Sequence, residues 1–573
     1  MTRIRLCLLC GLFFAAGACG NPNLAPLMND QTALHLIKSA RLALLNEGRD
    51  ETGSGRAVGV IVTIYDGEGQ RASVGVFGDE VTDCVNRAAA RLGKTVVEKD
   101  RLDPAFLSIH ILRDLRPVRW ARLRDSGFGY HRGLYSVMQI KNGETRAFTD
   151  VDMHVQGLSV AAAIRRLDQD KGTALFGKAP AQGVFLAATE SFTHDEQGGL
   201  VRLYRASTLL PKAGAAQIMQ GVRLGGDFLC GLLRDDNRFI YEGDVGRDHY
   251  DNTYNQLRHS GTIYALYQLY EATGEERYRQ TADRAWQWLL KQLRTDRDAH
   301  GNVCAFTVEV GKVKLGSSGL ALIALSERLR INRTEADLKL GRELANHLLR
   351  GQNENGSFNS YHPLKGKKTS RYRSIYYPGE AMLGLIRFYH FDPNPAYLNA
   401  VAKGAHYLIY DKWRVIGLEL FVLPDAWLML ALNDLHQVQP REDYVDYGLK
   451  IADGMMADQL LAGWQTPYPD YRGGYFPYPP QVTPAGARLE GLTATYLMAR
   501  RAGRDVAALR RTIAEAARFE VERVIRPEFV FLYPNPHRAL GAFRNSPISN
   551  RVRIDFNQHN ISGLLVAAKI LVE

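Results

Sequence analysis

Three acidic residues open apolar segments in the C-terminal two-thirds of the chain: Glu380, Asp425 and Glu490. Paired carboxyl groups can divide acid–base work, since one donates a proton to a leaving group while the other activates a water molecule. We therefore take Glu380, Asp425 and Glu490 as catalytic candidates, with Glu380 and Asp425 as the first pairing and Glu490 with Asp425 as the second. An Asp at the start of a helix also serves as an ordinary cap, so Asp425 is interpreted either as a catalytic residue or as a helix cap.

A second set of polar residues leads into the same apolar segments and could bind a substrate. Arginines can hold a carboxylate through two parallel hydrogen bonds, while His and Tyr can move protons. The predicted substrate-binding residues are Tyr254, Arg258, His259, Arg373, Tyr377, Arg488 and His559.

Aromatic residues, ten tyrosines and one phenylalanine, are concentrated in the loops before these segments. Sugar rings present apolar faces that stack on aromatic planes, and their hydroxyl groups bond to polar side chains. Loops rich in Tyr also pack against one another, so we expect only part of this set to face a ligand. Its members are Tyr250, Tyr254, Tyr361, Tyr372, Tyr376, Tyr377, Tyr468, Tyr471, Tyr475, Phe476 and Tyr478.

A repeated pair of helices must position these residues. An apolar, small-residue-rich helix recurs with starts near His259, Ser317, Gly379, Asp425, Glu490 and His559. Amphipathic partners are expected near 213–233, 275–293, 333–351, 394–410, 441–461 and 504–526. Helices that are apolar all round are buried, and one-sided helices face water. Six inner and six outer helices predict a closed (α/α)6 toroid over residues 209–573, with an open solenoid as the alternative.

The long loops of this toroid join outer to inner helices, so they gather at the N-terminal ends of the inner helices. We expect the polar candidates to converge there on one cleft. Packed helices lie about 8–10 Å apart. That spacing suits the separation of about 6.5–9.5 Å between the two carboxyl groups of an inverting glycosidase. Glu380 with Asp425 fits this span.

The N-terminal part has a different pattern. Helical spacing over 30–50 gives way to alternating strand-like runs at 59–65, 70–75, 106–112 and 133–140, with a helix at about 78–92. Residues 183–208 are strand-rich again. This order predicts an α/β domain over residues 30–208, placed before the all-α toroid.

Several motifs resemble known families. Gly59-Val-Ile-Val-Thr-Ile and Arg71-Ala-Ser-Val-Gly75 resemble the AMMECR1-like domain, although Ser73 replaces the family's cysteine and leaves any chemistry of that cysteine unsupported. The helical repeat resembles the six-hairpin glycosidase-like group, which implies action on a glycan. Gly351-Gln-Asn-Glu-Asn-Gly-Ser-Phe358 is similar to a structural turn of toroid proteins, and Asp555-Phe-Asn-Gln-His-Asn-Ile-Ser562 resembles the helical domain of glucuronyl C5-epimerases.

The first 18 residues resemble a bacterial lipoprotein signal peptide. A basic start is followed by a short apolar run and by Ala16-Gly17-Ala18-Cys19. The run is too short to span a bilayer. The resemblance implies lipidation at Cys19, a tether over 19–29 and an outer-membrane location facing the periplasm. An ordinary cleaved secretory signal is the alternative.

Composition limits the remaining functions. The 573 residues are 46% hydrophobic and carry a formal charge of +11, which suits a globular protein with a weak preference for acidic partners. We find no motif for a metal, a nucleotide or another cofactor, and expect no nucleic-acid binding. Cys230 and Cys304 could pair in an oxidising compartment.

The expected partner is a polysaccharide or oligosaccharide, with the membrane contacted only through the anchor. Glycoside hydrolysis is the first hypothesis, uronate lyase or C5-epimerase chemistry the second, and a non-catalytic glycan-binding or export scaffold the third.

Overall fold

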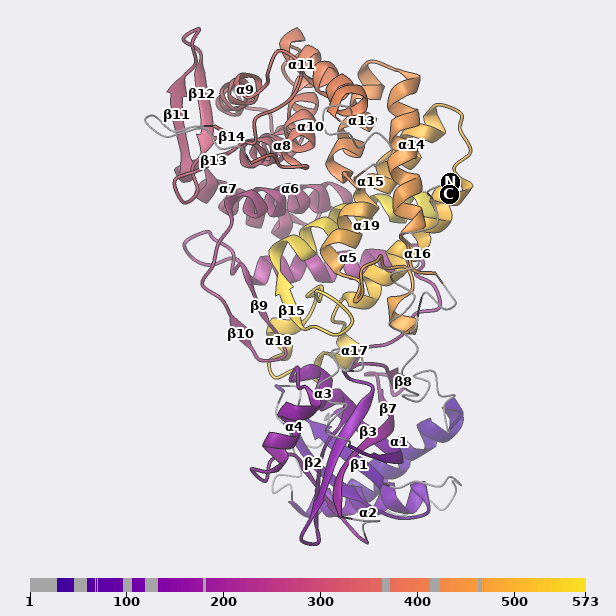
Figure 1. Ribbon diagram of the computed structural model, residues 1–573. Helices are drawn as coiled ribbons and strands as arrows, with labels where there is room; N and C mark the ends of the chain where they lie inside the picture. Colours follow the sequence, from indigo (N-terminus) through magenta and orange to yellow (C-terminus); the bar gives the residue numbers. More distant parts are fainter. Residues whose placement is uncertain are drawn as a thin grey trace.

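The computed structural model describes residues 28–45, 59–66, 68–69, 71–95, 106–118, 132–178, 182–362, 372–412, 423–461, 466 and 468–572. The predicted signal peptide and Cys19 lie outside these ranges. The chain forms two parts, a barrel domain built from residues up to 208 and a helical toroid from Ala215 onward (Figure 1).

The barrel domain is organised around one eight-stranded sheet. Its strands pair in the order β3-β1-β2-β6-β5-β4-β7-β8, and a further pairing of β3 with β7 closes the first seven into a barrel. β2 and β6 run parallel, and the other pairs are antiparallel. The strands are β1 (Gly59–Tyr65), β2 (Arg71–Val76), β3 (Phe106–Pro117), β4 (Tyr135–Lys141), β5 (Glu144–Phe148), β6 (Thr173–Phe176), β7 (Gly183–His194) and β8 (Leu200–Leu203).

Four helices accompany the sheet. α1 (Asp30–Leu45) and α2 (Val81–Thr95) pack together over one side, and their apolar residues share a core with β1 and β3. α3 (Asp150–Val155) is fixed by a capping box between Thr149 and Asp152, and α4 (Val160–Leu167) follows it. The four strands and two helices expected from the sequence are confirmed, whereas β5, β6, α3, α4 and the closure of the barrel were not predicted. Ser73 lies on β2 and bonds to Thr63 at 3.0 Å.

The toroid contains six inner and six outer helices. The inner helices are α6 (Gln256–Thr273), α8 (Leu315–Ile331), α10 (Tyr377–Tyr389), α13 (Ala426–Val438), α15 (Val482–Arg501) and α19 (Ile554–Val572). Each contacts the next, and α19 contacts α6, so the ring closes. The outer helices are α5 (Ala215–Gly231), α7 (Glu276–Gln292), α9 (Glu335–Arg350), α11 (Pro395–His406), α14 (Glu442–Ala457) and α16 (Ala507–Arg523). The predicted toroid architecture is confirmed, and the open solenoid is excluded.

Short elements complete the toroid. They are the strands β9 (Glu242–Asp244), β10 (His249–Tyr250), β11 (Leu293–Arg297), β12 (Val303–Thr307), β13 (Val313–Lys314), β14 (Tyr361–His362) and β15 (Arg551–Arg553), the helices α17 (Pro527–Val530) and α18 (Pro536–Ala539), the π-helix η5 (Tyr407–Asp411) and the 3-10 helix η6 (Pro469–Tyr471). Most of them lie in the loops that lead from outer to inner helices.

Glycine lets the inner helices approach one another. A Cβ atom added to Gly384 of α10 would stand 2.9 Å from the carbonyl oxygen of Gly319 on α8. One added to Gly379 would stand 2.7 Å from the backbone nitrogen of Leu428 on α13. These contacts explain why the inner helices are rich in small residues, and they bring the starts of α8, α10 and α13 close together.

Two predicted helix starts were wrong. Four inner helices begin within three residues of the predicted position, but α15 begins at Val482 and α19 at Ile554, so Glu490 and His559 lie inside their helices. The polar residues at the start of α19 concealed the helix, because the fold buries and bonds them. For example, the amide of Asn557 donates to the carbonyl oxygens of Gly225 and Gly541 at 3.0 and 3.1 Å.

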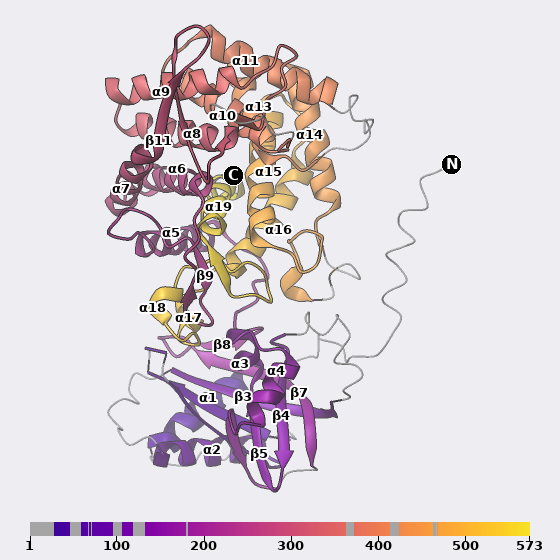
Figure 2. The same ribbon diagram turned by 60° about the vertical axis from the view of Figure 1, so that its left-hand side comes forward.

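The barrel domain is fixed against the toroid on the side of α17, α18 and β9 (Figures 1 and 2). Arg544 donates to the buried His154 at 2.8 Å, and the amide of Asn550 donates to the backbone oxygens of His154 and Val155 at 2.8 and 3.0 Å. Phe531 stacks on Phe106 with ring centroids 4.4 Å apart. Buried hydrogen bonds and ring contacts of this kind make the junction rigid.

Two further sequence expectations concern cysteines and the membrane. Cys230 and Cys304 are free thiols, so the pairing considered for them does not occur. Among the helices that the structure describes, none is long and apolar enough to cross a bilayer.

Candidate active site

Two buried carboxyl groups from neighbouring inner helices form the centre of the site. Glu380 stands in the first turn of α10, and Asp425 caps α13 by accepting from the backbone nitrogen of Leu428 at 3.1 Å. Their side chains belong to residues only 3% and 4% exposed. Among the described residues, Oε2 of Glu380 has no hydrogen-bond partner. We call Glu380 and Asp425 the carboxyl pair.

Burial makes both members of the carboxyl pair weak acids. Burial, and secondly the charge of Asp425, raise the pKa of Glu380 to about 8, against a smaller opposing effect of Lys314. Burial raises the pKa of Asp425 to about 7, although the Leu428 hydrogen bond and Lys412 act in the other direction. One group therefore keeps its proton near neutral pH while the other is partly ionised, which is the state that acid–base catalysis needs.

An aromatic cluster borders the carboxyl pair. Tyr376 is 43% exposed and Tyr372 55% exposed. The Tyr361 ring centroid lies 5.5 Å from that of Tyr372 and 6.3 Å from that of Tyr377. Burial raises the pKa of Tyr376, and the charges of Asp425 and Glu380 raise it further while Arg488 lowers it. The carboxyl pair, Arg488 and these tyrosines thus share one electrostatic environment.

The carboxyl pair depends on a glycine of α8. A Cβ atom added to Gly316 would stand 1.9 Å from Oε2 of Glu380 and 2.5 Å from the ring of Tyr377. Three consecutive inner helices therefore build this part of the site, and no side chain larger than hydrogen fits at Gly316 without moving the carboxyl group.

A second polar group lies deeper in the ring. Glu490 of α15 accepts from Tyr264 of α6 at 2.7 Å through Oε1 and bonds to Nδ1 of His559 at 2.6 Å through Oε2. Burial alone lowers the pKa of His559, but the charge and hydrogen bond of Glu490 outweigh it and raise that pKa. Within the described ranges, Nε2 of His559 has no bonded partner. We call Glu490 and His559 the histidine dyad.

Trp427 joins the two groups. Its ring centroid lies 5.8 Å from that of His559 and 6.4 Å from that of Tyr264, both edge-on, and it follows Asp425 by two residues. The carboxyl pair and the histidine dyad are therefore neighbours around one tryptophan.

Comparisons with known proteins give structural neighbours only. No family model matches the chain, and no curated protein matches it. Among solved structures, the chain is similar to a D-mannose isomerase, with a TM-score of 0.47 at 13% identity over 63% of this chain and 100% of that one. It is also similar to cellobiose 2-epimerase from Bacillus thermoamylovorans B4167, with a TM-score of 0.48 at 13% identity over 62% and 99% of the two chains. An unsaturated glucuronyl hydrolase specific for heparin matches with a TM-score of 0.45 at 12% identity over 62% and 98%.

The structure places Tyr254 and His259 in the wall of the toroid and Arg258 close to the histidine dyad. His259 is fully buried, and its two ring nitrogens bond to the hydroxyl of Tyr254 at 2.6 Å and the carbonyl oxygen of Ala285 at 3.0 Å. Burial lowers the pKa of His259 to about 4. Arg258 pairs with Asp555 at 3.0 Å. Tyr254, Arg258 and His259 thus form bonds within the wall of the toroid.

Two predicted arginines differ in exposure. Arg373 is exposed and donates to the carbonyl oxygen of Tyr372 at 3.4 Å. Arg488 has a side chain only 12% exposed, and its guanidinium lies 4.8 Å from the ring centroid of Tyr475 and 3.9 Å from Asp458. Of the predicted binding residues, Tyr377 and Arg488 lie beside the carboxyl pair, and His559 belongs to the histidine dyad. Arg258 is close enough to the dyad for its charge to lower the pKa of His559.

Sequence reasoning missed Trp427, Tyr264 and Lys314. Tyr264 lies two turns inside an apolar helix, where nothing in the sequence separates it from core tyrosines. Trp427 had a signal, because it stands in the first turn after Asp425. Within the described ranges, no group of three or more His, Cys, Asp or Glu side chains is arranged to hold a metal ion.

Proposed function

We propose that the toroid hydrolyses a glycosidic bond of a polysaccharide or oligosaccharide. The proposal is carried by the carboxyl pair, two buried acids from adjacent inner helices with pKa values of about 8 and about 7. Glu380 keeps its proton and would donate it to the leaving oxygen. Asp425 would accept a proton from the attacking water as its C–O bond to the sugar forms.

The surroundings of the carboxyl pair support a sugar substrate. Tyr372 and Tyr376 offer exposed aromatic faces beside the acids, and Tyr361 backs them. Such faces stack on sugar rings, and Arg488 would bond to ring substituents. The positive charge of Arg488 also favours a substrate that carries a carboxylate near the cleaved bond.

A second function rests on the histidine dyad. A His held by a carboxylate through Nδ1, with Nε2 unbonded among the described residues, is suited to removing a proton from carbon. This arrangement favours a uronate lyase or C5-epimerase reaction, in which the proton lies next to a carboxylate group. Glu490 would then position His559 and stabilise its charged form.

Product analysis separates these functions. Wild-type protein would be incubated with a panel of neutral and uronate-containing polysaccharides in deuterated water. Hydrolysis produces new reducing ends without an unsaturated sugar. A lyase produces ultraviolet absorbance, and an epimerase places deuterium on the sugar carbon. A non-catalytic binding module produces none of these, which would refute both proposed reactions.

We also propose that the protein is anchored in the cell envelope. Residues 1–18 would be removed as a signal peptide, and Cys19 would carry the lipid. The tether over 19–29 would hold the barrel domain near the outer membrane on its periplasmic side. Replacing residues 1–19 with an ordinary cleaved secretory signal should release the protein into the soluble periplasmic fraction, whereas continued membrane association of that protein would contradict the anchor.

A further inference from the structure

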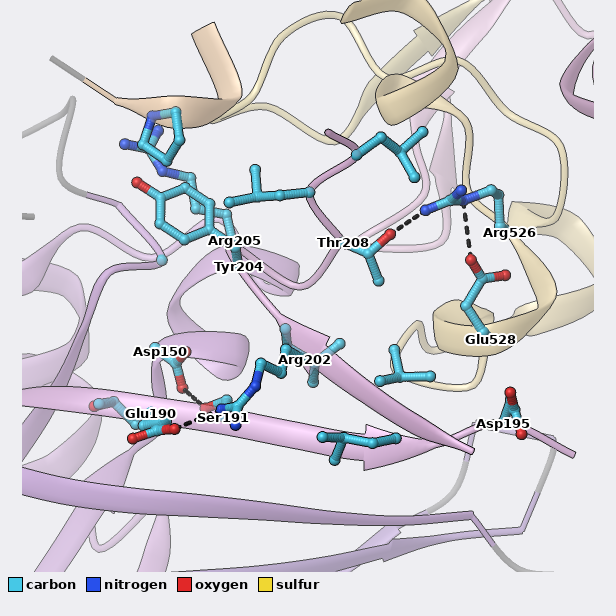
Figure 3. Close-up of a pocket in the computed structure, with 18 of the residues that line it drawn as sticks. Asp150, Glu190, Ser191, Asp195, Arg202, Tyr204, Arg205, Thr208, Arg526 and Glu528 are labelled. Carbon is cyan, nitrogen blue, oxygen red and sulfur yellow. Dashed lines mark hydrogen bonds and ion pairs between the residues drawn. The ribbon is translucent and has the colours of Figure 1, made fainter. Parts of the chain in front are cut away.

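A cavity of about 1050 Å³ lies between the barrel domain and the toroid (Figure 3). Its barrel side comes from β7 and β8, and its toroid side from the start of α5 and from α17. This volume matches the upper end of the range of small-molecule sites, about 300–1000 Å³, and such sites favour domain interfaces. The cavity has room for several linked sugar rings and is distinct from the carboxyl pair.

The walls carry charges that compensate one another. Arg202 donates to Asp30 at 2.7 Å and to Glu190 at 2.6 Å. Arg526 pairs with Glu528 at 3.1 Å and also bonds to Thr208. Figure 3 shows the pairs that Arg202 forms with Glu190 and that Arg526 forms with Glu528. Guanidinium groups already held in this way are poorly suited to capturing a phosphate or a carboxylate.

The balance of charge also disfavours an anion. Six carboxyl groups and four guanidinium groups line the cavity. On the floor, Ser191 donates to Asp150 at 2.6 Å, which leaves that carboxylate bonded within the protein. Glu196 stands exposed at the rim. A negatively charged ligand would meet net negative walls, which disfavour its binding.

Neutral polar groups remain to bind an uncharged ligand. Three glutamines, Gln197, Gln217 and Gln220, line the cavity. Gln197 and Gln220 are exposed at the rim, and their side-chain amides form no hydrogen bond within the described ranges. Leu209, 39% exposed, adds an apolar surface beside them. Amide groups match the hydroxyl groups of a sugar, and the apolar surface matches its ring faces.

We propose that this cavity binds a short, uncharged oligosaccharide segment, as a second glycan site remote from the carboxyl pair. The neutral polar chemistry comes from the cavity itself, and the choice of a glycan rests on the proposed function. Because the Arg544–His154 and Asn550 hydrogen bonds fix the two domains, the site is preformed. A second site would hold a polymer on the protein between successive reactions.

This proposal is tested by measuring oligosaccharide binding to variants in which a bulky side chain blocks the cavity. Full-length protein carrying Glu380→Gln would be titrated calorimetrically with maltotetraose, cellotetraose, xylotetraose, mannotetraose and tetragalacturonate. Gln220→Trp places a bulky ring at the rim from an exposed position of α5. Gln280→Trp, at an exposed position of the outer helix α7, is the matched control.

We expect at least one neutral tetrasaccharide to bind in a way that Gln220→Trp weakens more than 10-fold and Gln280→Trp leaves unchanged. Binding that is insensitive to Gln220→Trp, binding of tetragalacturonate alone, or no binding by any member overturns the proposal. A cavity that binds while the wild type shows no hydrolysis would refute only the proposed function, and hydrolysis without Gln220-sensitive binding would refute only this inference.

Discussion

Replacing Glu380 by Gln tests the electrostatics of the carboxyl pair through protein stability. Burial, and secondly Asp425, raise the pKa of Glu380 from 4.5 to about 8. Between those pH values the folded chain keeps a proton that the unfolded chain releases. The free energy of unfolding therefore falls as the pH rises through this window, and the stabilising effect is complete only below the unfolded pKa. Gln cannot ionise, so the unfolding free energy of the variant does not fall with pH for this reason.

The size of this stability change follows from the difference between the unfolded and folded pKa values of Glu380. At about 1.4 kcal/mol per pH unit, a pKa raised from 4.5 to about 8 corresponds to at most about 5 kcal/mol. Relaxation of the charged form reduces this value. Between pH 5 and pH 8, wild type should lose unfolding free energy that Glu380→Gln keeps. Relative to wild type, we expect the variant to gain about 2–4 kcal/mol over this interval.

Urea unfolding followed by tryptophan fluorescence measures this difference, since five of the six tryptophans lie in residues 209–573. Glu354→Gln, which changes an exposed loop carboxylate, is the matched control and should show no such pH dependence. An equal effect of Glu380→Gln at both pH values, or destabilisation at pH 8, would refute the reasoning.

Three further predictions concern activity. The pH profile of kcat/KM should rise as Asp425 loses its proton near pH 7 and fall as Glu380 loses its proton near pH 8, and a profile that is flat from pH 6 to 9 would contradict the assignment. Gly316→Ala should reduce kcat more than 10-fold because its methyl group displaces the Glu380 carboxyl, whereas Gly454→Ala, with open space around its Cβ, should match wild type in the same rate assay. Glu490→Gln should lower the pKa of His559, seen by NMR titration of the imidazole, and an unchanged value would remove the dyad from the account.

The sequence predicted the toroid well because its signals are local. Outer helices alternate polar and apolar faces, and inner helices combine Gly, Ala and Leu, so both sets are readable within one helix length. The start of α19 was misplaced because its first turn is polar, as at Asp555 and Asn557, and the start of α15 because Pro484 and Arg488 interrupt its apolar pattern. The side chain of Asn557 is satisfied by a partner remote in sequence, the carbonyl oxygen of Gly225.

In the barrel domain, contacts between residues remote in sequence decide even more of the fold. Its strands follow from alternation, but the pairing of β3 with β7, which closes the barrel, joins Ser108 to Thr193 across 85 residues. No local pattern specifies such a pairing.

The candidate site was predicted in part. Glu380 and Asp425 were found because acids at the starts of apolar helices are rare and face the same end of a ring. His259 was selected for the same reason, but its ring bonds to Tyr254 and the Ala285 carbonyl oxygen instead. Position along a helix identifies the end on which a residue lies, and does not identify which way its side chain points.

The most direct test of the account compares reducing-end release by Glu380→Gln, Asp425→Asn and Glu520→Gln on a polysaccharide that wild type cleaves. Glu520 is a fully buried carboxyl of the outer helix α16 whose pKa burial also raises, so it controls for the removal of a buried acid. The account predicts that Glu380→Gln and Asp425→Asn remain folded and lose at least 1000-fold in rate, on the order expected for removal of a catalytic acid or base, while Glu520→Gln keeps wild-type activity. Folded Glu380→Gln and Asp425→Asn proteins that retain wild-type rates would contradict it.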